Sequence, residues 1–123
     1  MISKCDRKKL ARRFVEYVRD QRNYRNINLS REEVSSVLGV TKGMLTSAIH
    51  DELQSTFPDL VNKYRAYHAH RLLMSESNSD VPLDEIAIRS GFSNRMTMHR
   101  TFIKVYGISP GKIKKDIITN ANG

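Results

Sequence analysis

The amino-acid sequence predicts an all-α fold, and three observations support this prediction. Apolar residues recur at intervals of three and four along most of the chain, as they do on one face of a helix. No stretch of useful length shows the strict apolar–polar alternation of a half-buried strand. Glycine, proline and hydroxyl residues stand where such helices would begin and end. At 123 residues the chain has the size of one compact domain or of two small adjoining ones.

The first helix is expected near the N-terminus. Leu10, Phe14 and Val18 recur at helical spacing and predict a helix over about residues 7–22. It should end in the polar stretch 23–28.

A capping box opens the second helix. Ser30 can cap the helix start, while Glu33, three residues later, can return a bond to the cap. This short helix is expected to end near Gly39. Thr41 can cap the third helix, which is predicted over about residues 41–53. Its apolar positions are Met44, Leu45, Ala48, Ile49 and Leu53.

The middle of the chain predicts a long helix and a short one. Pro58 ends the preceding segment, and the apolar and aromatic residues after it predict a helix over about residues 59–75. A polar link follows, and Pro82 opens a short helix that ends at Gly91.

Two more helices complete the chain. Ser93 or Asn94 caps the sixth helix, which Gly107 stops. Ser109 caps the seventh, with Pro110 at the first helical position, where its missing amide costs nothing.

Two stretches, 33–41 and 85–93, share one pattern and both run into a second helix. Each has an acidic residue, a branched apolar residue and a small residue, followed by glycine, an apolar residue and a hydroxyl residue. Small residues let two helices cross closely, and glycine adopts the positive φ of a turn, so the pattern indicates two helix-turn-helix units. The paired positions are Ser35 and Ala87, Gly39 and Gly91, Val40 and Phe92, and, with one extra residue in the second copy, Leu45 and Met98, Ile49 and Phe102.

Positive charge is concentrated at the two ends of the chain. The net charge is +8 and the isoelectric point is about 9.9. Residues 1–25 and 94–123 are strongly basic, whereas residues 26–60 are net acidic. This distribution suits a polyanionic partner, while any one cluster is also compatible with a solvated face. Because a helix-turn-helix unit places its second helix in the major groove, the expected partner is double-stranded DNA.

The stretch from Leu83 to Lys115, LDEIAIRSGFSNRMTMHRTFIKVYGISPGKIKK, resembles the second helix-turn-helix of the AraC/XylS family of bacterial transcription regulators. Residues 60–73 resemble the linker helix of that family, and the resemblance covers about residues 10–116. It implies a homeodomain-like domain of about seven helices, in which a long linker helix joins two helix-turn-helix subdomains. The matching residues are Ile86-Ala87, Gly91-Phe92, Phe102, Tyr106-Gly107 and Ser109-Pro110.

The resemblance also implies an organisation along the chain. The expected parts are a basic N-terminal segment over 1–9, a first helix-turn-helix subdomain over 10–57, the linker helix over 58–76, a second subdomain over 77–119 and a tail over 120–123. A linker of about seventeen residues would be ~25 Å long. Two recognition helices about one DNA turn apart, ~34 Å, would enter successive major-groove segments from the same side.

By the family's pattern, the two recognition helices span about 41–53 and 94–105 and carry the base contacts. Arg95 and Arg100 are expected to read guanine, because a guanidinium donates two bonds to its major-groove edge. Asn94 either reads adenine or, as the favoured role, caps its helix. The expected base-contacting residues are Lys42, Met44, Thr46, Ser47, His50, Asn94, Arg95, Met96, His99 and Arg100. The expected phosphate-contacting residues are Ser30, Thr41, Ser93, Lys104, Lys112, Lys114 and Lys115.

The first recognition helix departs from the family's pattern. It has Gly43, Thr46 and Ser47 where family members often carry bulky, amide or guanidinium side chains. We therefore expect the first unit to rely more on methyl and hydroxyl contacts, water and DNA shape than on direct readout.

Several classes of function are not expected. The chain lacks a nucleophile elbow, a phosphate loop, an HExxH motif and paired carboxylates, so we expect neither enzymatic activity nor a cofactor. Its single cysteine, Cys5, excludes a disulfide within the chain and Cys-rich zinc sites, so no metal is expected. No apolar run approaches the ~18 residues of a membrane helix, and we expect a cytoplasmic protein.

The expected partners are promoter or operator DNA, RNA polymerase and a sensor domain. AraC-type regulators commonly carry a ligand-binding or signal-receiving region before this module, so the sequence fits either the C-terminal part of a longer regulator or a small stand-alone one. Two other functions remain open. One is a nonspecific or RNA-binding helical protein, and the other is a helical adaptor whose basic face meets an acidic protein.

Overall fold

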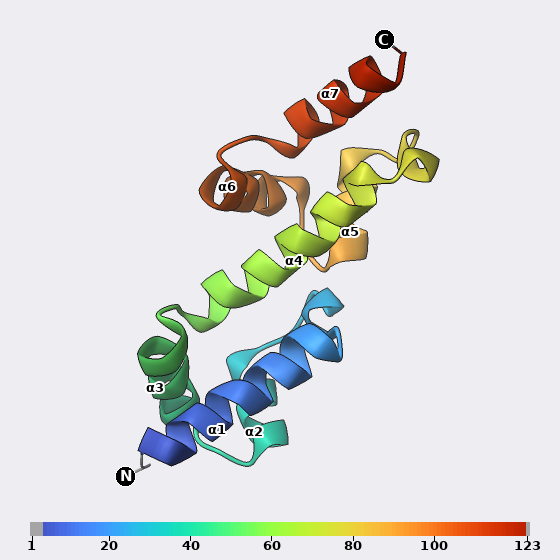
Figure 1. Cartoon of the computed structure of the whole chain (residues 1–123). Helices are drawn as coiled ribbons and strands as arrows, with labels where there is room; N and C mark the ends of the chain where they lie inside the picture. The colour runs from blue at the N-terminus through green and yellow to red at the C-terminus, as the bar shows by residue number, and fades with distance from the viewer. Residues whose placement is uncertain (1–3, 123) are drawn as a thin grey trace. The chain divides into compact units, whose positions relative to one another are not determined.

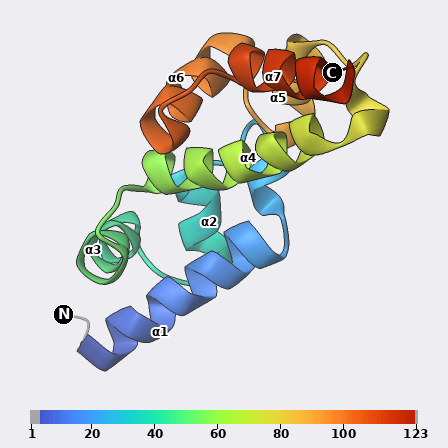
Figure 2. The same cartoon turned by 45° about the horizontal axis from the view of Figure 1, so that its top comes forward.

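The computed structural model describes the backbone of residues 4–122 and the side chains of residues 6–120. Within that range the chain forms seven α-helices, two short 3₁₀ helices and one π-helical turn, with no strand (Figures 1 and 2). The predicted all-α fold is confirmed. The chain divides into two compact units, Met1–Val61 and Asn62–Gly123, and the boundary falls inside helix α4 (Phe57–Met74).

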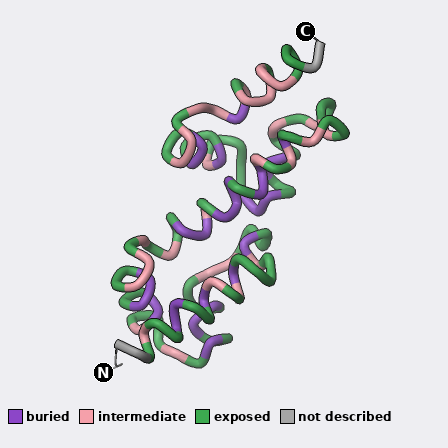
Figure 3. The backbone as a smooth tube through the Cα atoms, in the orientation of Figure 1, coloured by how far each residue is buried: buried purple, intermediate pink, exposed green. Residues whose placement is uncertain are grey.

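Three α-helices form the first unit: α1 (Lys4–Val15), α2 (Arg31–Leu38) and α3 (Lys42–Leu53). Helix α1 packs against α2 and α3, and α2 packs against α3. Buried residues recur at intervals along each helix, as the purple stretches in Figure 3 show, and most of them are apolar. The core residues are Leu10, Ala11, Phe14, Val18, Tyr24, Val34, Leu38, Leu45, Ala48 and Ile49.

The end of the first helix differs from the predicted helix over 7–22. Helix α1 is followed by a π-helical turn, Glu16–Asp20, in which the N–H of Gln21 donates to the carbonyl of Glu16 at 2.9 Å. This bond spans five residues instead of four and widens the turn. Val18 within the turn is fully buried. Apolar spacing alone does not distinguish an α turn from a π turn, and the sequence therefore did not reveal it.

The predicted basic segment over 1–9 is not separate from the first helix, because its residues from Lys4 onward belong to α1. Residues 1–3 and the side chain of Cys5 lie outside the part of the chain that the structure describes.

Helix α2 ends in a Schellman motif. The N–H of Gly39 donates to the carbonyl of Ser36 at 3.1 Å, and the N–H of Val40 donates to that of Ser35 at 3.0 Å. Gly39 has a φ of 71°, in the left-handed region that residues with a Cβ disfavour. This conformation explains why glycine occupies the position. The side chain of Ser35 is buried and small, so the chain can turn closely into α3.

The second unit repeats this turn. Helix α5 (Leu83–Ser90) ends at Gly91, whose φ is 100°. The N–H of Gly91 donates to the carbonyl of Ile88 at 3.1 Å, and that of Phe92 to the carbonyl of Ala87 at 3.0 Å. The equivalence of the two stretches extends to individual hydrogen bonds.

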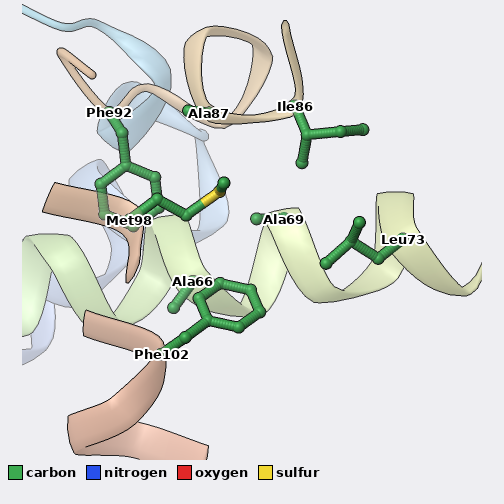
Figure 4. Packing of buried hydrophobic residues seen from close by; sticks show 8 residues of the cluster. All are labelled: Ala66, Ala69, Leu73, Ile86, Ala87, Phe92, Met98 and Phe102. Carbon is green, nitrogen blue, oxygen red and sulfur yellow. The ribbon is translucent and has the colours of Figure 1, made fainter. Parts of the chain in front are cut away.

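The second unit contains most of α4, with α5, α6 (Arg95–Tyr106) and α7 (Pro110–Asn122). Figure 4 shows its core, in which Ala66 and Ala69 of α4 face the large side chains of Met98 and Phe102 on α6, and Leu73 of α4 lies on the side of Ile86 on α5. The ring of Phe102 lies beside Ala66, and this small residue leaves room for it. The core residues are Ala66, Ala69, Leu73, Ile86, Ala87, Phe92, Met98 and Phe102.

Helix α4 starts earlier than the predicted 59–75. The side-chain oxygen of Thr56 accepts the N–H of Asp59 at 3.2 Å, so Thr56 caps a helix that begins at Phe57. Pro58 then lies inside the first turn, where its missing amide breaks no helical bond. The sequence interpretation overlooked Thr56 as a cap and therefore placed the start too late.

The start of α7 agrees with the prediction. The N–H of Lys112 donates to the side-chain oxygen of Ser109 at 3.1 Å, and Pro110 is the first helical residue. Gly107, which ends α6, has a φ of 70°. In residues 4–122 no helix combines the length and apolarity needed to cross a bilayer.

Candidate nucleic-acid interface

Helix α3 has a polar outer face over a buried inner face. The side-chain oxygen of Thr41 accepts the N–H of Met44 at 3.1 Å, as a helix cap does. Leu45 and Ile49 are fully buried beneath the helix. The predicted base-contacting residues Lys42, Thr46, Ser47 and His50 are exposed, and Met44 is half-buried.

Lys42 is paired with a carboxylate at the start of α2. Its Nζ lies 3.3 Å from Oε1 of Glu32, and both side chains are exposed. A backbone hydrogen bond, followed by the hydrogen bond and charge of Lys42, lowers the pKa of Glu32. Glu32 is therefore ionised at neutral pH, and the charge that Lys42 offers to DNA is partly offset.

His50 also faces an acidic neighbour. Its Nδ1 lies 3.0 Å from Oδ1 of Asp51, whose Oδ2 lies 3.5 Å from an Nη of Arg7. A carboxylate here repels phosphates but can accept a hydrogen bond from cytosine. The outer face of α3 is therefore mixed in charge.

The structure brings Arg31, which was not among the predicted site residues, onto this face. Arg31 is the first residue of α2, and its Nη1 donates to Oγ1 of Thr46 at 2.9 Å. The two residues are 15 positions apart, and no local pattern signals a contact over that distance. The only feature of the sequence that hints at a donor from another helix is the lack of long hydrogen-bond donors at the outward positions of α3. A shallow hollow beside this contact is lined by Arg31, Glu32, Thr46, Ser47, His50, Asp51, Ser55, Thr56, Phe57 and Pro58.

Asn94, not Ser93, caps α6. Its Oδ1 accepts the N–H of Thr97 at 2.8 Å and the hydroxyl of Thr97 at 3.1 Å. The inner face of α6 is anchored by Met98 and Phe102, which are fully buried. The favoured role of Asn94, capping its helix, is therefore confirmed.

The outer face of α6 is a stripe of long side chains. Successive helical residues are turned by about 100°, so residues 96, 99, 100 and 103 lie opposite the buried side of the helix. Arg95 and Lys104 flank the stripe on its two sides and are exposed. Among the described residues, Arg95, His99 and Arg100 form no side-chain hydrogen bond or ion pair. The stripe consists of Met96, His99, Arg100 and Ile103, all exposed.

The predicted phosphate-contacting hydroxyl residues lie at helix starts. Ser30 caps α2, because its Oγ accepts the N–H of Glu33 at 3.1 Å, and Thr41 caps α3. Each capping hydroxyl still has its own O–H to donate. Ser93 is exposed next to the cap of α6.

The predicted phosphate-contacting lysines differ in their surroundings. Lys112 pairs with Asp116 at 3.1 Å, whereas the Nζ of Lys114 donates to the carbonyl of Val81 at 2.7 Å. Lys104 and Lys115 are exposed, and Lys115 forms no ion pair with another described residue. Lys115 is therefore the α7 lysine most available to an external anion. Among the described residues, no three histidine, cysteine or carboxylate side chains gather to hold a metal ion.

Comparison with known proteins places this geometry in a family. A family model described as a helix-turn-helix domain matches residues 34–116. The C-terminal domain of AraT, a response regulator from Geobacillus stearothermophilus, is 30% identical over 87% of this chain and 84% of that one, with a TM-score of 0.74. No curated protein matches the chain.

Two further solved structures share the fold. The DNA-binding domain of AdpA, in complex with a target DNA, is 17% identical over 89% of this chain and 94% of that one, with a TM-score of 0.75. A transcriptional regulator with an AraC-type DNA-binding domain from Chromobacterium violaceum is 18% identical over 90% of this chain and 91% of that one, with a TM-score of 0.68.

The family model spans most of the chain, from the middle of α2 into α7, and so includes the turn of each unit and the helix that follows it, α3 or α6. The repeated Schellman turns and the buried residue pairs behind α3 and α6 give the physical basis of that match. The chain belongs to the AraC-type family of helix-turn-helix domains found in DNA-binding transcription regulators.

Proposed function

We propose that the chain binds double-stranded DNA in a sequence-specific manner, as the reading module of an AraC-type transcription regulator. In this proposal α3 and α6 enter two successive segments of the major groove. The observation that carries the proposal is the stripe on α6, in which exposed long side chains lie over a fully buried inner face. The structure of the AdpA domain in complex with its target DNA supports the proposal that this chain binds DNA, because that domain has the same fold.

Arg100 is the central reading residue of the second unit. It lies in the middle of the stripe, and a guanidinium can donate two hydrogen bonds to O6 and N7 of guanine. Such a pair contributes about 1–3 kcal/mol of discrimination against the wrong base. Met96 on the same stripe suits contact with a thymine methyl group, and His99 can exchange hydrogen bonds with base edges.

Arg95 lies at the flank of the stripe and has two candidate roles, a base contact near the start of α6 or a phosphate contact beside it. Lys104 and Lys115 are assigned to phosphates. Phosphate contacts fix the register of a protein on DNA without reading its sequence. Lys112 and Lys114 are also assigned to phosphates. To contact DNA, Lys112 has to break its ion pair with Asp116, and Lys114 has to break its hydrogen bond to the Val81 carbonyl.

Selection from random duplexes, followed by sequencing, tests the proposal. The wild-type chain should enrich one motif, and Arg100→Ala should relax the preference at one base pair while lowering affinity for the motif about tenfold. Lys115→Ala is the matched control, because loss of a phosphate contact should weaken all duplexes by a similar factor. It is a better control than Lys114→Ala, since Lys114 also bonds Val81 within the protein.

Two outcomes would contradict the proposal. Steeply salt-dependent binding without an enriched motif would indicate a nonspecific nucleic-acid-binding protein. Absence of DNA binding even at low salt would favour a protein-interaction adaptor.

Family membership alone also leads us to propose RNA polymerase and a sensor region as partners. In vitro transcription from a promoter that carries the selected motif tests the first of these. Unchanged transcript levels with the added protein would contradict it.

A further inference from the structure

The contact between Arg31 and Thr46 gives the first unit a long donor that its recognition helix lacks. We propose that Arg31 determines specificity in the first unit by reading a base edge beside α3, and that Thr46 is the residue that positions it. This inference rests on the proposed function, since it assigns a residue to DNA reading by the same interface. The Nη1 of Arg31 lies 2.9 Å from Oγ1 of Thr46, on the exposed side of α3.

The outward positions of α3 leave room for this side chain. Gly43 and Ser47 lie at the centre of the outer face, because they are opposite the buried Leu45 and Ile49 at about 100° per residue. Beyond its chain neighbours and the backbone of its own helix, a Cβ built on Gly43 would meet only Oγ1 of Thr41, 4.0 Å away, so the space above the helix is open. A guanidinium that arrives from α2 can occupy the place that a long side chain on α3 would otherwise fill.

The distribution of charge around α3 also favours Arg31 as the residue that contacts DNA. Residues 26–60 are all described and contain two cationic side chains, Arg31 and Lys42. Lys42 is in an ion pair with Glu32, whereas the partner of Arg31 is a neutral hydroxyl. The charge of Arg31 also helps to lower the pKa of Glu32, but Arg31 forms no ion pair among the described residues, on a face that also carries Asp51.

The hydrogen bond to Thr46 prepares Arg31 for a base contact. A guanidinium has five N–H donors in a planar fork, so one bond to a hydroxyl leaves enough for a bidentate contact. Holding the side chain in place before binding reduces the conformational entropy that binding would otherwise cost. Thr46 thus acts through Arg31, and its removal should affect the base that Arg31 reads.

The test uses the full chain in the random-duplex selection, with four single variants and one double variant. Arg31→Ala should flatten the preference at one base pair, distinct from the one that Arg100→Ala affects, and lower affinity for the motif about tenfold. Arg31→Lys should keep most of the affinity for random DNA but lose the preference, because an ammonium lacks the planar fork. Arg25→Ala, which removes an exposed arginine of the same unit, should leave the motif unchanged.

Thr46→Val separates positioning from an independent contact, because it keeps the branched shape and removes the hydroxyl. It should weaken the preference at the same base pair as Arg31→Ala, and the double variant should lose no more than Arg31→Ala alone. Circular dichroism of each variant checks that the fold is intact.

Equal losses on all duplexes for Arg31→Ala, with recovery in Arg31→Lys, would show a phosphate contact and overturn the inference. Effects of Arg31→Ala and Thr46→Val at different base pairs would overturn the role of Thr46. If the wild-type motif depends on Arg100 but not on Arg31, the inference fails while the proposed function stands. Absence of any motif overturns both.

Discussion

The two glycines that end the first helices of the helix-turn-helix units differ in backbone conformation. Gly39 has a φ of 71°, close to the left-handed helical region, whereas Gly91 has a φ of 100°. Asparagine tolerates the first region, but the second lies further from any conformation that side chains adopt. The two positions therefore differ in how strictly they need glycine, although they occupy equivalent places in the repeat.

We predict that Gly91→Ala destabilises the protein more than Gly39→Ala, for which the expected cost is about 1 kcal/mol. A Cβ at Gly39 meets no atom within 4 Å, so its cost comes from the backbone alone. Gly39→Asn should lose less than Gly39→Ala. Urea unfolding followed by circular dichroism measures all three variants, and equal losses at the two glycines would contradict the prediction.

Two neighbouring lysines of α7 provide a second comparison at this scale. Lys114 donates to the Val81 carbonyl at 2.7 Å, whereas Lys115 is exposed. Lys114→Ala should lower the free energy of unfolding by about 1 kcal/mol, because a charge-assisted bond is lost. Lys115→Ala should change it by less than about 0.5 kcal/mol. Urea titration of both variants checks this, and identical stabilities would show that the bond to Val81 contributes nothing.

The contacts that sequence reasoning missed are those of long side chains with groups far away along the chain. Arg31 and Thr46 are 15 residues apart, and Lys114 and Val81 are 33 apart. Periodicity predicts which face of a helix is outward, and it correctly placed Arg100 on such a face. It carries no information on how a long side chain from one helix lies across another.

At the scale of the element, helix starts were well predicted where a cap residue precedes a clear apolar pattern. Ser30, Thr41 and Ser109 all cap as expected. Thr56 was missed because the proline two residues later was interpreted as a break. The π-helical turn after α1 was missed because its buried Val18 fits helical spacing equally well.

Substitutions at Asn94 test whether this residue only caps α6 or also contacts a DNA base. Asn94→Ala should cost about 1 kcal/mol of stability, because the N–H of Thr97 loses its acceptor. Asn94→Ser should keep the stability within a few tenths of a kcal/mol, since serine caps as well as asparagine. Thermal or urea unfolding measures the stability, and the selected DNA motif should be the same for Asn94→Ser as for the wild type. A changed base preference in that variant would show that Asn94 reads adenine as well.

Tyr106 joins α6 to α4 through its ring. It stacks on His70 with centroids 4.9 Å apart and packs against Phe102 at 5.2 Å. Burial, followed by the proximity of Tyr67, raises the pKa of Tyr106 above its ordinary value of 10.0, and Arg71 partly opposes the rise. The folded state therefore holds the proton more tightly than the unfolded state.

This shift predicts a loss of stability at alkaline pH. The contribution of Tyr106 should be fully present below pH 10 and should decline as pH rises through the folded-state pKa. Tyr106→Phe keeps the ring but cannot ionise, so its free energy of unfolding should fall less between pH 9 and pH 11 than that of the wild type. Urea titrations at several pH values give the difference between the two proteins. A difference that does not change with pH would contradict the assigned shift.

At the scale of the whole molecule, the sequence predicted the architecture because the same turn occurs twice. Two copies of one hydrogen-bonded motif, each followed by a helix with a buried inner face, leave few alternatives for the fold. The effect of charge on DNA binding does not follow from a local motif in the same way. It depends on the total charge of the molecule as well as on single contacts with phosphates. The chain carries a net charge of +8, yet residues 26–60 are net acidic. Affinity and association rate should therefore respond differently to the removal of equal charge at different places.

Two double variants that each remove two positive charges separate these effects. Lys104→Ala with Lys115→Ala should reduce the slope of log affinity against log salt by about 1.8, or ~0.9 for each lost phosphate contact. Arg12→Ala with Arg13→Ala removes exposed charges from α1, outside the proposed interface. It should leave that slope unchanged while slowing association at low salt, because the attraction of the whole molecule for DNA is weaker. Fluorescence anisotropy on the selected duplex between about 50 and 200 mM salt gives the slopes, and stopped-flow mixing gives the rates. Equal changes of slope in the two variants would mean that α1 also lies on DNA, and the interface would then have to include it.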